Sequence, residues 1–122
     1  MKQKTNQLSE CLLIYGAEIL KMTSKLEKTT TNREIAKQLL RSGTSVGANY
    51  EEACAAQSRA DFIHKLQIVL KEIRESLYWL RLIEKAEILN GQRFNEIINE
   101  TKQISNIIAQ SIITAKKNKF PI

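Results

Sequence analysis

Apolar residues recur at steps of three and four along almost the whole 122-residue chain, and its one proline lies near the end, at position 121. This spacing puts the apolar side chains of a helix on one face, whereas a strand would need alternation. Short polar stretches divide the pattern into four segments. We therefore predict an all-α protein, an antiparallel up-down-up-down four-helix bundle of one domain over residues 1–122, with helices at about 5–28, 32–57, 59–90 and 92–117.

Local signals indicate where these helices begin and end. Thr31 with Glu34, and Ser58 with Asp61, place a hydroxyl at the expected start of a helix and an acid three residues later. Asn90-Gly91 is expected to end the third helix. The expected core seam of the first helix is Leu8, Leu12, Tyr15, Ile19, Met22 and Leu26.

The second predicted helix contains two glycines, Gly43 and Gly47, which normally disfavour a helix interior. An unbroken apolar stripe nevertheless passes through them, and no proline interrupts it. We therefore predict that the helix is continuous and that the glycines allow another backbone to come close. The stripe consists of Ile35, Leu39, Val46, Tyr50 and Ala53.

A polar stripe lies on another face of the same helix. Arg41 within it is costly to bury unless paired, and Glu72 and Glu75 of the third helix are its natural partners, with Glu52 a third candidate. The alternative is a ligand or nucleic-acid site built from Arg41 and Asn49, where nearby acids would repel phosphate. The stripe residues, at steps of four, four and three, are Arg41, Ser45, Asn49 and Glu52.

The run Arg-x-x-x-Ser-Val-x-x-Asn-x-x-Glu-Ala from Arg41 to Ala53, followed by Ser58, Phe62 and a long Glu-bearing helix, resembles the bacterial four helix bundle proteins. These are also called 23S rRNA intervening-sequence proteins. The resemblance covers nearly the whole chain, although Ala53 stands where many members carry glycine and Tyr50 where isoleucine is common. It implies a four-helix bundle that assembles into a homopentameric ring and has no established catalytic activity.

The sequence offers no catalytic, metal-binding or cofactor-binding residues that we would single out, so we expect no enzyme and no cofactor. Glu72-x-x-Glu75 has the spacing of a bundle metal motif, but the one histidine, His64, has no glutamate three residues before it. Ser42 and its hydroxyl neighbours lack a histidine that could act as a base. Structural ion pairs are the simpler explanation of the acids.

Three apolar residues lie off the main seam of the third helix: Ile68, Trp79 and Leu82. Interface cores favour aromatic residues, so a line that contains the one tryptophan predicts self-association. We expect a homo-oligomer, and the family resemblance implies a pentamer.

Nineteen Lys and Arg against thirteen Asp and Glu give a net charge of +6, which favours a polyanionic partner. We expect sequence-independent binding to RNA or DNA backbones, because no reader motif is present and most of the seven aromatic residues belong to core seams, which disfavours base stacking. The alternative is a protein–protein scaffold with no nucleic-acid role. The candidate contacts, gathered at one end of the bundle, are Lys21, Lys25, Lys28, Arg33, Lys37, Lys85 and Arg93.

The cellular location is expected to be cytoplasmic. The first residues are polar rather than a signal peptide, and no apolar run approaches the length of a membrane span. Cys11 and Cys54 have apolar neighbours and are expected to be core thiols.

Overall fold

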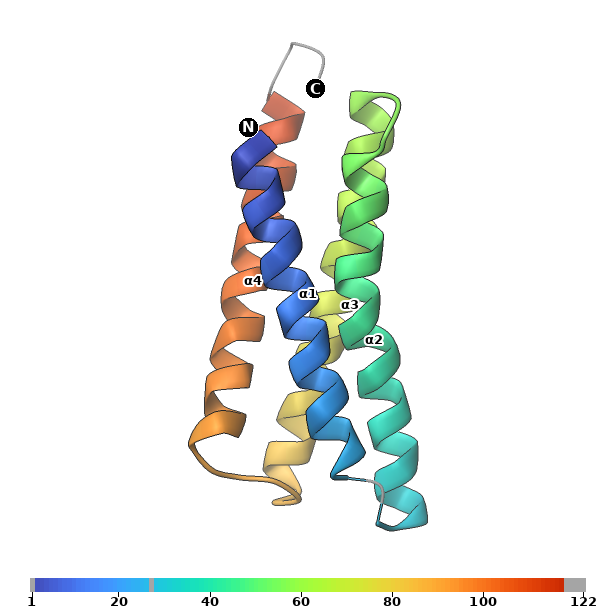
Figure 1. Ribbon diagram of the computed structural model, residues 1–122, viewed down its shortest axis with the longest axis vertical. Helices are drawn as coiled ribbons and strands as arrows, with labels where there is room; N and C mark the ends of the chain where they lie inside the picture. The colour runs from blue at the N-terminus through green and yellow to red at the C-terminus, as the bar shows by residue number, and fades with distance from the viewer. Residues whose placement is uncertain (1, 27, 118–122) are drawn as a thin grey trace.

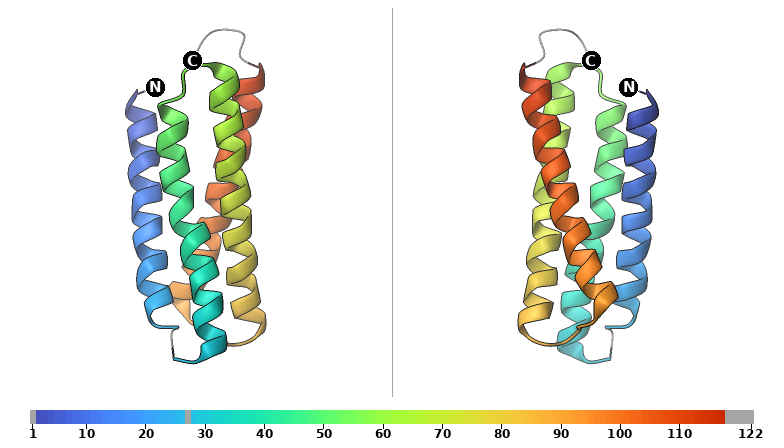
Figure 2. Two further views of the ribbon diagram at one scale, coloured as in Figure 1. Left: turned by 90° about the vertical axis from the view of Figure 1, so that its right-hand side faces the viewer. Right: turned by 90° about the vertical axis from the view of Figure 1, so that its left-hand side faces the viewer.

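The computed structural model describes residues 2–26 and 28–117, with side chains from residue 7 onward. The chain forms four long helices that run along one axis and alternate in direction (Figures 1 and 2), which confirms the predicted all-α antiparallel bundle. The helices are α1 (Lys2–Ser24), α2 (Thr30–Cys54), α3 (Arg59–Lys85) and α4 (Gln92–Lys117). In the described residues, no helix has the length and apolar character that crossing a membrane requires.

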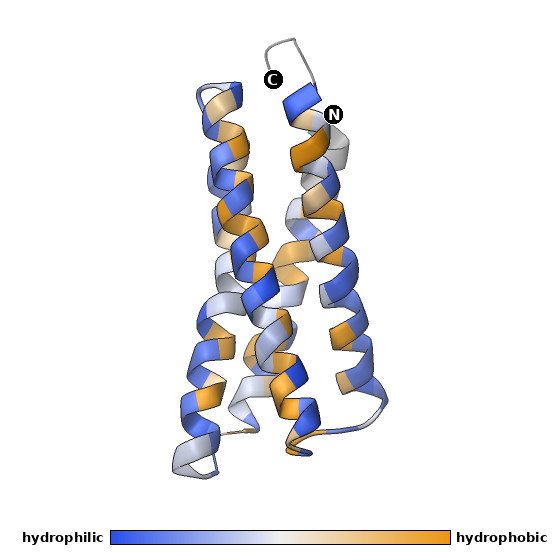
Figure 3. Ribbon diagram, turned by 180° about the vertical axis from the view of Figure 1, so that it is seen from behind, coloured by the Kyte–Doolittle hydropathy of each residue, from blue (hydrophilic) through white to orange (hydrophobic). Residues whose placement is uncertain are grey.

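Each helix turns one apolar face inward, and hydrophobic and hydrophilic residues alternate in bands along every ribbon in Figure 3. The predicted seam of α1 is buried except for Leu8, which is half-buried. Burying a leucine or isoleucine side chain contributes about 1.5–3 kcal/mol, so this core dominates the stability of the fold. Cys11 and Cys54 do not belong to it; both are exposed, which corrects the expectation of core thiols.

The helices that follow one another along the chain pack with their backbones close together, whereas α1 and α4 close the bundle across a wider seam. Among the described residues, no Cα atom of α1 lies within 8 Å of one in α4. Side chains bridge this seam: Tyr15 Oη lies 2.7 Å from Thr101 Oγ1 in the core, and Arg93 Nη2 lies 3.1 Å from Glu18 Oε2. Burial raises the pKa of Tyr15 to about 12, because the phenolate would be poorly solvated.

The α2 helix is continuous through Gly43 and Gly47, as the apolar stripe predicted. Both glycines face α1. A Cβ atom added at Gly43 would lie 2.8 Å from Ile19 Cγ2, closer than real Cβ contacts allow, whereas one at Gly47 would lie 3.4 Å from the carbonyl oxygen of Leu12. The missing side chain at Gly43 therefore sets how closely α1 and α2 approach.

The start of α2 differs from the prediction. Thr29, rather than Thr31, is the N-cap, and its Oγ1 accepts a hydrogen bond from the Asn32 amide at 3.1 Å. Three consecutive threonines could each serve this role, and the first of them gives the longer helix. The predicted cap of α3 is present, since Ser58 Oγ accepts from the Asp61 amide at 3.1 Å.

The first three helices end earlier than predicted, at Ser24, Cys54 and Lys85. After α3, the Glu87 amide donates to the carbonyl of Glu84, and the Ile88 amide to that of Ile83, each at 3.1 Å. Glu87 has a φ of 58°, the left-handed conformation of a Schellman motif, in which glycine is the usual residue. Ile88 then packs against the core, so the chain leaves the helix before the predicted stop at Asn90-Gly91.

Candidate functional site

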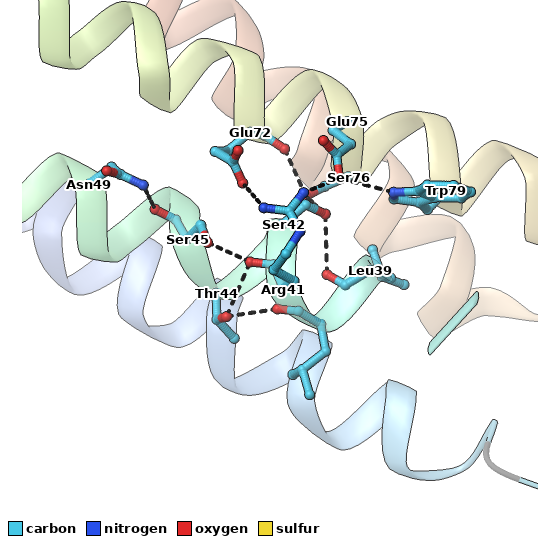
Figure 4. A network of polar contacts seen from close by, with 11 residues as sticks. Leu39, Arg41, Ser42, Thr44, Ser45, Asn49, Glu72, Glu75, Ser76 and Trp79 are labelled. Carbon is cyan, nitrogen blue, oxygen red and sulfur yellow. Dashed lines mark hydrogen bonds and ion pairs between the residues drawn. The ribbon is translucent and has the colours of Figure 1, made fainter. Parts of the chain in front are cut away.

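A polar network joins the middle of α2 to the middle of α3 (Figure 4). Arg41 Nη1 donates to Glu72 Oε2 at 3.0 Å, and Arg41 Nη2 donates to Glu75 Oε2. The indole N–H of Trp79 donates to the same oxygen of Glu75 at 3.3 Å. Two of the three candidate partners of Arg41 are therefore used, whereas Glu52 is exposed and makes no contact in this network.

The network lies at the edge of the core, where the hydrogen bond that Arg41 donates to Glu75 raises the pKa of Arg41 and so favours its charged form. Half of the Arg41 side chain is exposed, against 10% for Glu72 and 29% for Glu75. Burial raises the pKa of Glu75, but hydrogen bonds from Trp79 and Arg41 outweigh it and bring the pKa below the ordinary value. Two carboxylates compensate the Arg41 charge, so the network is poorly suited to bind a phosphate.

The other stripe residues of α2 bond to their own helix. Ser45 Oγ donates to the Arg41 carbonyl at 2.6 Å, and Asn49 Nδ2 donates to the Ser45 carbonyl at 2.9 Å. Closer to the core, Ser76 Oγ of α3 donates to Ser42 Oγ of α2 at 2.8 Å, and this contact is buried. The Ser42–Ser76 pair thus adds to the α2–α3 contact, whereas Ser45 and Asn49 use donors within α2 rather than present them to a ligand.

The chemistry of a metal site is not assembled in the described part of the chain. No group of three His, Cys, Asp or Glu side chains there could hold a metal ion. Glu72 and Glu75, which have the spacing of a bundle metal motif, instead share Arg41.

The three residues predicted at an oligomer interface are only partly open to solvent. Trp79 is half-buried and packs against the core, Ile68 is half-buried, and Leu82 is 38% exposed. Apolar side chains with a larger exposed fraction lie on α1, where Leu13 is 67% and Leu20 is 54% exposed. Periodicity alone could not separate them from the core, because they border the buried seam of the same helix.

The predicted nucleic-acid contacts gather at the end of the bundle where α1 and α3 end and α2 and α4 begin (Figure 1). All seven are exposed. Arg93, however, is surrounded by three carboxylates, those of Glu18 at 3.1 Å, Glu100 at 3.2 Å and Glu96 at 3.9 Å. Its charge is compensated, which weakens this group as a phosphate site.

A second basic surface, of which the sequence reasoning named only Lys85, runs along the solvent side of α3. We define the α3 outer face as five exposed residues at helical spacing: Lys71, Arg74, Tyr78, Arg81 and Lys85. No acidic residue falls on this helical face, and in the described part of the chain none of its four cations has a carboxylate within ion-pair distance. The available signal was the helical spacing of the four basic residues, which follow one another at steps of three, seven and four.

A shallow groove of ≈ 370 Å³ lies on this face. Its lining combines basic and apolar side chains: Arg74, Leu77, Tyr78, Arg81, Leu82 and Lys85. Tyr78 is 60% exposed, so an aromatic ring lies in the open among cations.

Comparison with known proteins places this geometry in context. The family model of the 23S rRNA-intervening sequence protein matches residues 7–110. A crystal structure from Bacteroides thetaiotaomicron, of a protein with unknown function from the S23 ribosomal protein family, superimposes with a TM-score of 0.82. It is 38% identical, and the match covers 89% of this chain and 97% of that one. Among curated proteins, no match was found.

Proposed function

This chain belongs to the 23S rRNA-intervening sequence protein family, and we propose that it acts without catalysis as a nucleic-acid-binding module that holds RNA or DNA by the phosphate backbone. The observation that carries the proposal is the α3 outer face, where four exposed cations form no ion pair with a carboxylate among the described residues. Arg41 and Arg93 form ion pairs with carboxylates, whereas these four cations form none among the described residues, although the charge of Lys71 helps to lower the pKa of Glu75.

The dimensions of this face suit a nucleic-acid strand. Lys71 to Lys85 spans about 21 Å at 1.5 Å per residue, which equals roughly six phosphates along one strand of a duplex. The four cations line up along the helix axis rather than around a point, as contact with an extended polyanion requires. Phosphate contacts of this kind carry no sequence information, so binding should be indifferent to sequence.

Self-association would multiply this charge. Leu13, Ile14 and Leu20 expose more than half of their side chains on α1, and contact with a second copy would bury them. The pentamer that the resemblance implies would then carry five copies of the α3 outer face.

The assembly state is checked by light scattering at micromolar concentration. We expect a mass that is a multiple of the 14.0 kDa chain, and five times that mass for the pentamer. A mass of one chain would overturn self-association, whereas a dimer or tetramer would reject only the pentamer.

Binding is checked by fluorescence anisotropy with mixed-sequence RNA and duplex DNA at low and moderate salt. For duplex DNA, the logarithm of the affinity should fall with the logarithm of salt concentration by about 0.9 per neutralised phosphate, or roughly 3.6 for four cations. Arg74→Gln with Arg81→Gln should reduce that slope by nearly half, since two contacts are lost.

The matched control is Lys102→Gln with Lys117→Gln, which removes two exposed cations of α4 and should leave the slope of the α3 contacts unchanged. If the unaltered protein binds neither nucleic acid at low salt, the proposal is wrong and a protein–protein scaffold becomes the better account. Salt-resistant, sequence-selective binding would also contradict it, because phosphate contacts produce neither property.

A further inference from the structure

We propose that the α3 outer face binds single-stranded nucleic acid, with a base stacked on Tyr78 and the flanking cations on the phosphates. This inference rests on the proposed function and narrows it to one surface and one kind of strand. It departs from the expectation that base stacking is improbable, because that expectation assigned most aromatic residues to the core.

Tyr78 is an exposed ring that its neighbours hold in place. Its centroid lies 5.2 Å from that of Trp79, with the ring planes at 75°, an edge-to-face contact. Trp79 packs against the core and is tied to Glu75 by its indole N–H. The Tyr78 ring therefore rests on a fixed support while 60% of its surface remains open, and a base that stacks on it need not order a mobile side chain first.

The surroundings of the ring match the two halves of a nucleotide. Leu77 and Leu82 give the groove apolar walls, and Arg74 and Arg81, one helical turn on either side of Tyr78, give it cationic ends. A base offers an apolar face to the ring, and its phosphates can reach the guanidinium groups. Every base has such a face, so stacking is tolerant of sequence.

The geometry favours a single strand over a duplex. In a duplex the base faces are covered by neighbouring bases, so Tyr78 could contribute nothing and only the cations would act. A single strand can contact both the Tyr78 ring and the cations. An acidic peptide could satisfy the cations too, but it would leave the exposed ring without a stacking partner.

The test compares a single-stranded oligouridylate of about 12 nucleotides with a mixed-sequence RNA duplex of about the same length, by fluorescence anisotropy at low salt. Tyr78→Ala should weaken single-strand binding at least about fivefold, the lower end of the range for losing one stacked base. Duplex binding should change less than about twofold. Tyr78→Phe should bind like the unaltered protein, because it keeps the ring.

Ile113→Ala is the matched control, since Ile113 is an exposed apolar residue on α4, and it should leave both affinities unchanged. Thermal melting followed by circular dichroism verifies that each variant is folded. Unchanged single-strand affinity in Tyr78→Ala would overturn the stacking inference. If the double variant Arg74→Gln with Arg81→Gln still weakened binding to both the single strand and the duplex, the proposed function would survive that result.

Two further outcomes separate the remaining possibilities. If the unaltered protein binds neither the single strand nor the duplex, the inference and the proposed function both fail. If polyglutamate of equal charge competes as well as the oligouridylate, the face recognises negative charge without bases, and the inference is wrong in favour of an acidic protein partner.

Discussion

Replacing Gly43 by leucine is expected to lower the free energy of unfolding by up to about 2 kcal/mol. A Cβ atom at this position would lie 2.8 Å from Cγ2 and 3.2 Å from Cβ of Ile19, whose side chain is fully buried. Overpacking of this kind costs about 1–3 kcal/mol and occasionally more, and the better helix propensity of leucine returns only about 0.8 kcal/mol of it. Helices α1 and α2 would have to separate.

Gly47→Ala is the control for this experiment, because its Cβ would make an ordinary 3.4 Å contact with the Leu12 carbonyl oxygen. Removing a glycine from a helix interior should then stabilise the protein by about 0.5–1 kcal/mol. Urea unfolding followed by circular dichroism measures both variants. A Gly43→Leu protein as stable as the original would show that α1 and α2 are not held as close as the structure describes.

Replacing Arg41 by alanine is expected to cost about 1–3 kcal/mol at neutral pH. The substitution leaves Glu72, whose side chain is only 10% exposed, as a carboxylate without its cation. Removing one partner of a buried pair costs about 3–5 kcal/mol and an exposed pair is worth about 1 kcal/mol or less, and the half-exposed Arg41 lies between these cases. Glu72→Gln in the same protein should recover part of the loss, because it removes the stranded charge.

The Arg41 effect should depend on pH in one direction. The folded-state pKa of Glu75 lies below its ordinary value of 4.5, so Glu75 contributes stability above that pH and loses it as pH falls through the folded pKa. The difference between Arg41→Ala and the original protein should therefore be full at neutral pH and shrink in acid. Urea unfolding at neutral and at acidic pH measures this difference in stability, and Lys37→Ala, which removes an exposed cation of α2, is the control. A deficit of the same size in acid would refute the role of these carboxylates.

The course of the helices and the Arg41 contact could be predicted from the sequence, because both follow from helical spacing. Ile35 and Ala53 stay in phase across Gly43, so a break there would have put one of them in water. Arg41 needed a carboxylate near the core, and Glu72 and Glu75 occupy the matching face of α3.

The ends of the helices were harder to predict, because they depend on single residues whose type does not identify them as caps. Glu87 adopts a left-handed conformation in which glycine or asparagine is usual, so the chain turned before the glycine that seemed to mark the stop. At the start of α2, Thr29 and Thr31 are chemically equivalent caps, and only the packed structure distinguishes them.

The exposed ring could not be assigned because Leu77, Tyr78 and Trp79 are consecutive. Three adjacent residues point around most of a helix, and periodicity gives no rule for which of them the neighbouring helices will cover. Leu77 turns toward the core and Trp79 packs beside Glu75, which leaves Tyr78 outside. That outcome depends on where α2 and α4 lie, which is tertiary information.

The order in which the helices pack bears on how quickly the chain can fold. Among the described residues, every close backbone contact between helices joins two that are consecutive in the sequence, so each pairing closes only a short connection. Topologies dominated by such local contacts have low contact order and belong to the fast-folding class. Side chains join α1 to α4, through Tyr15 with Thr101 and through Glu18 with Arg93, and the first pair, 86 positions apart, carries the largest loop-closure cost among the hydrogen bonds of the described residues. Closing the seam between α1 and α4 early in folding would therefore return the least free energy for the chain entropy that is lost.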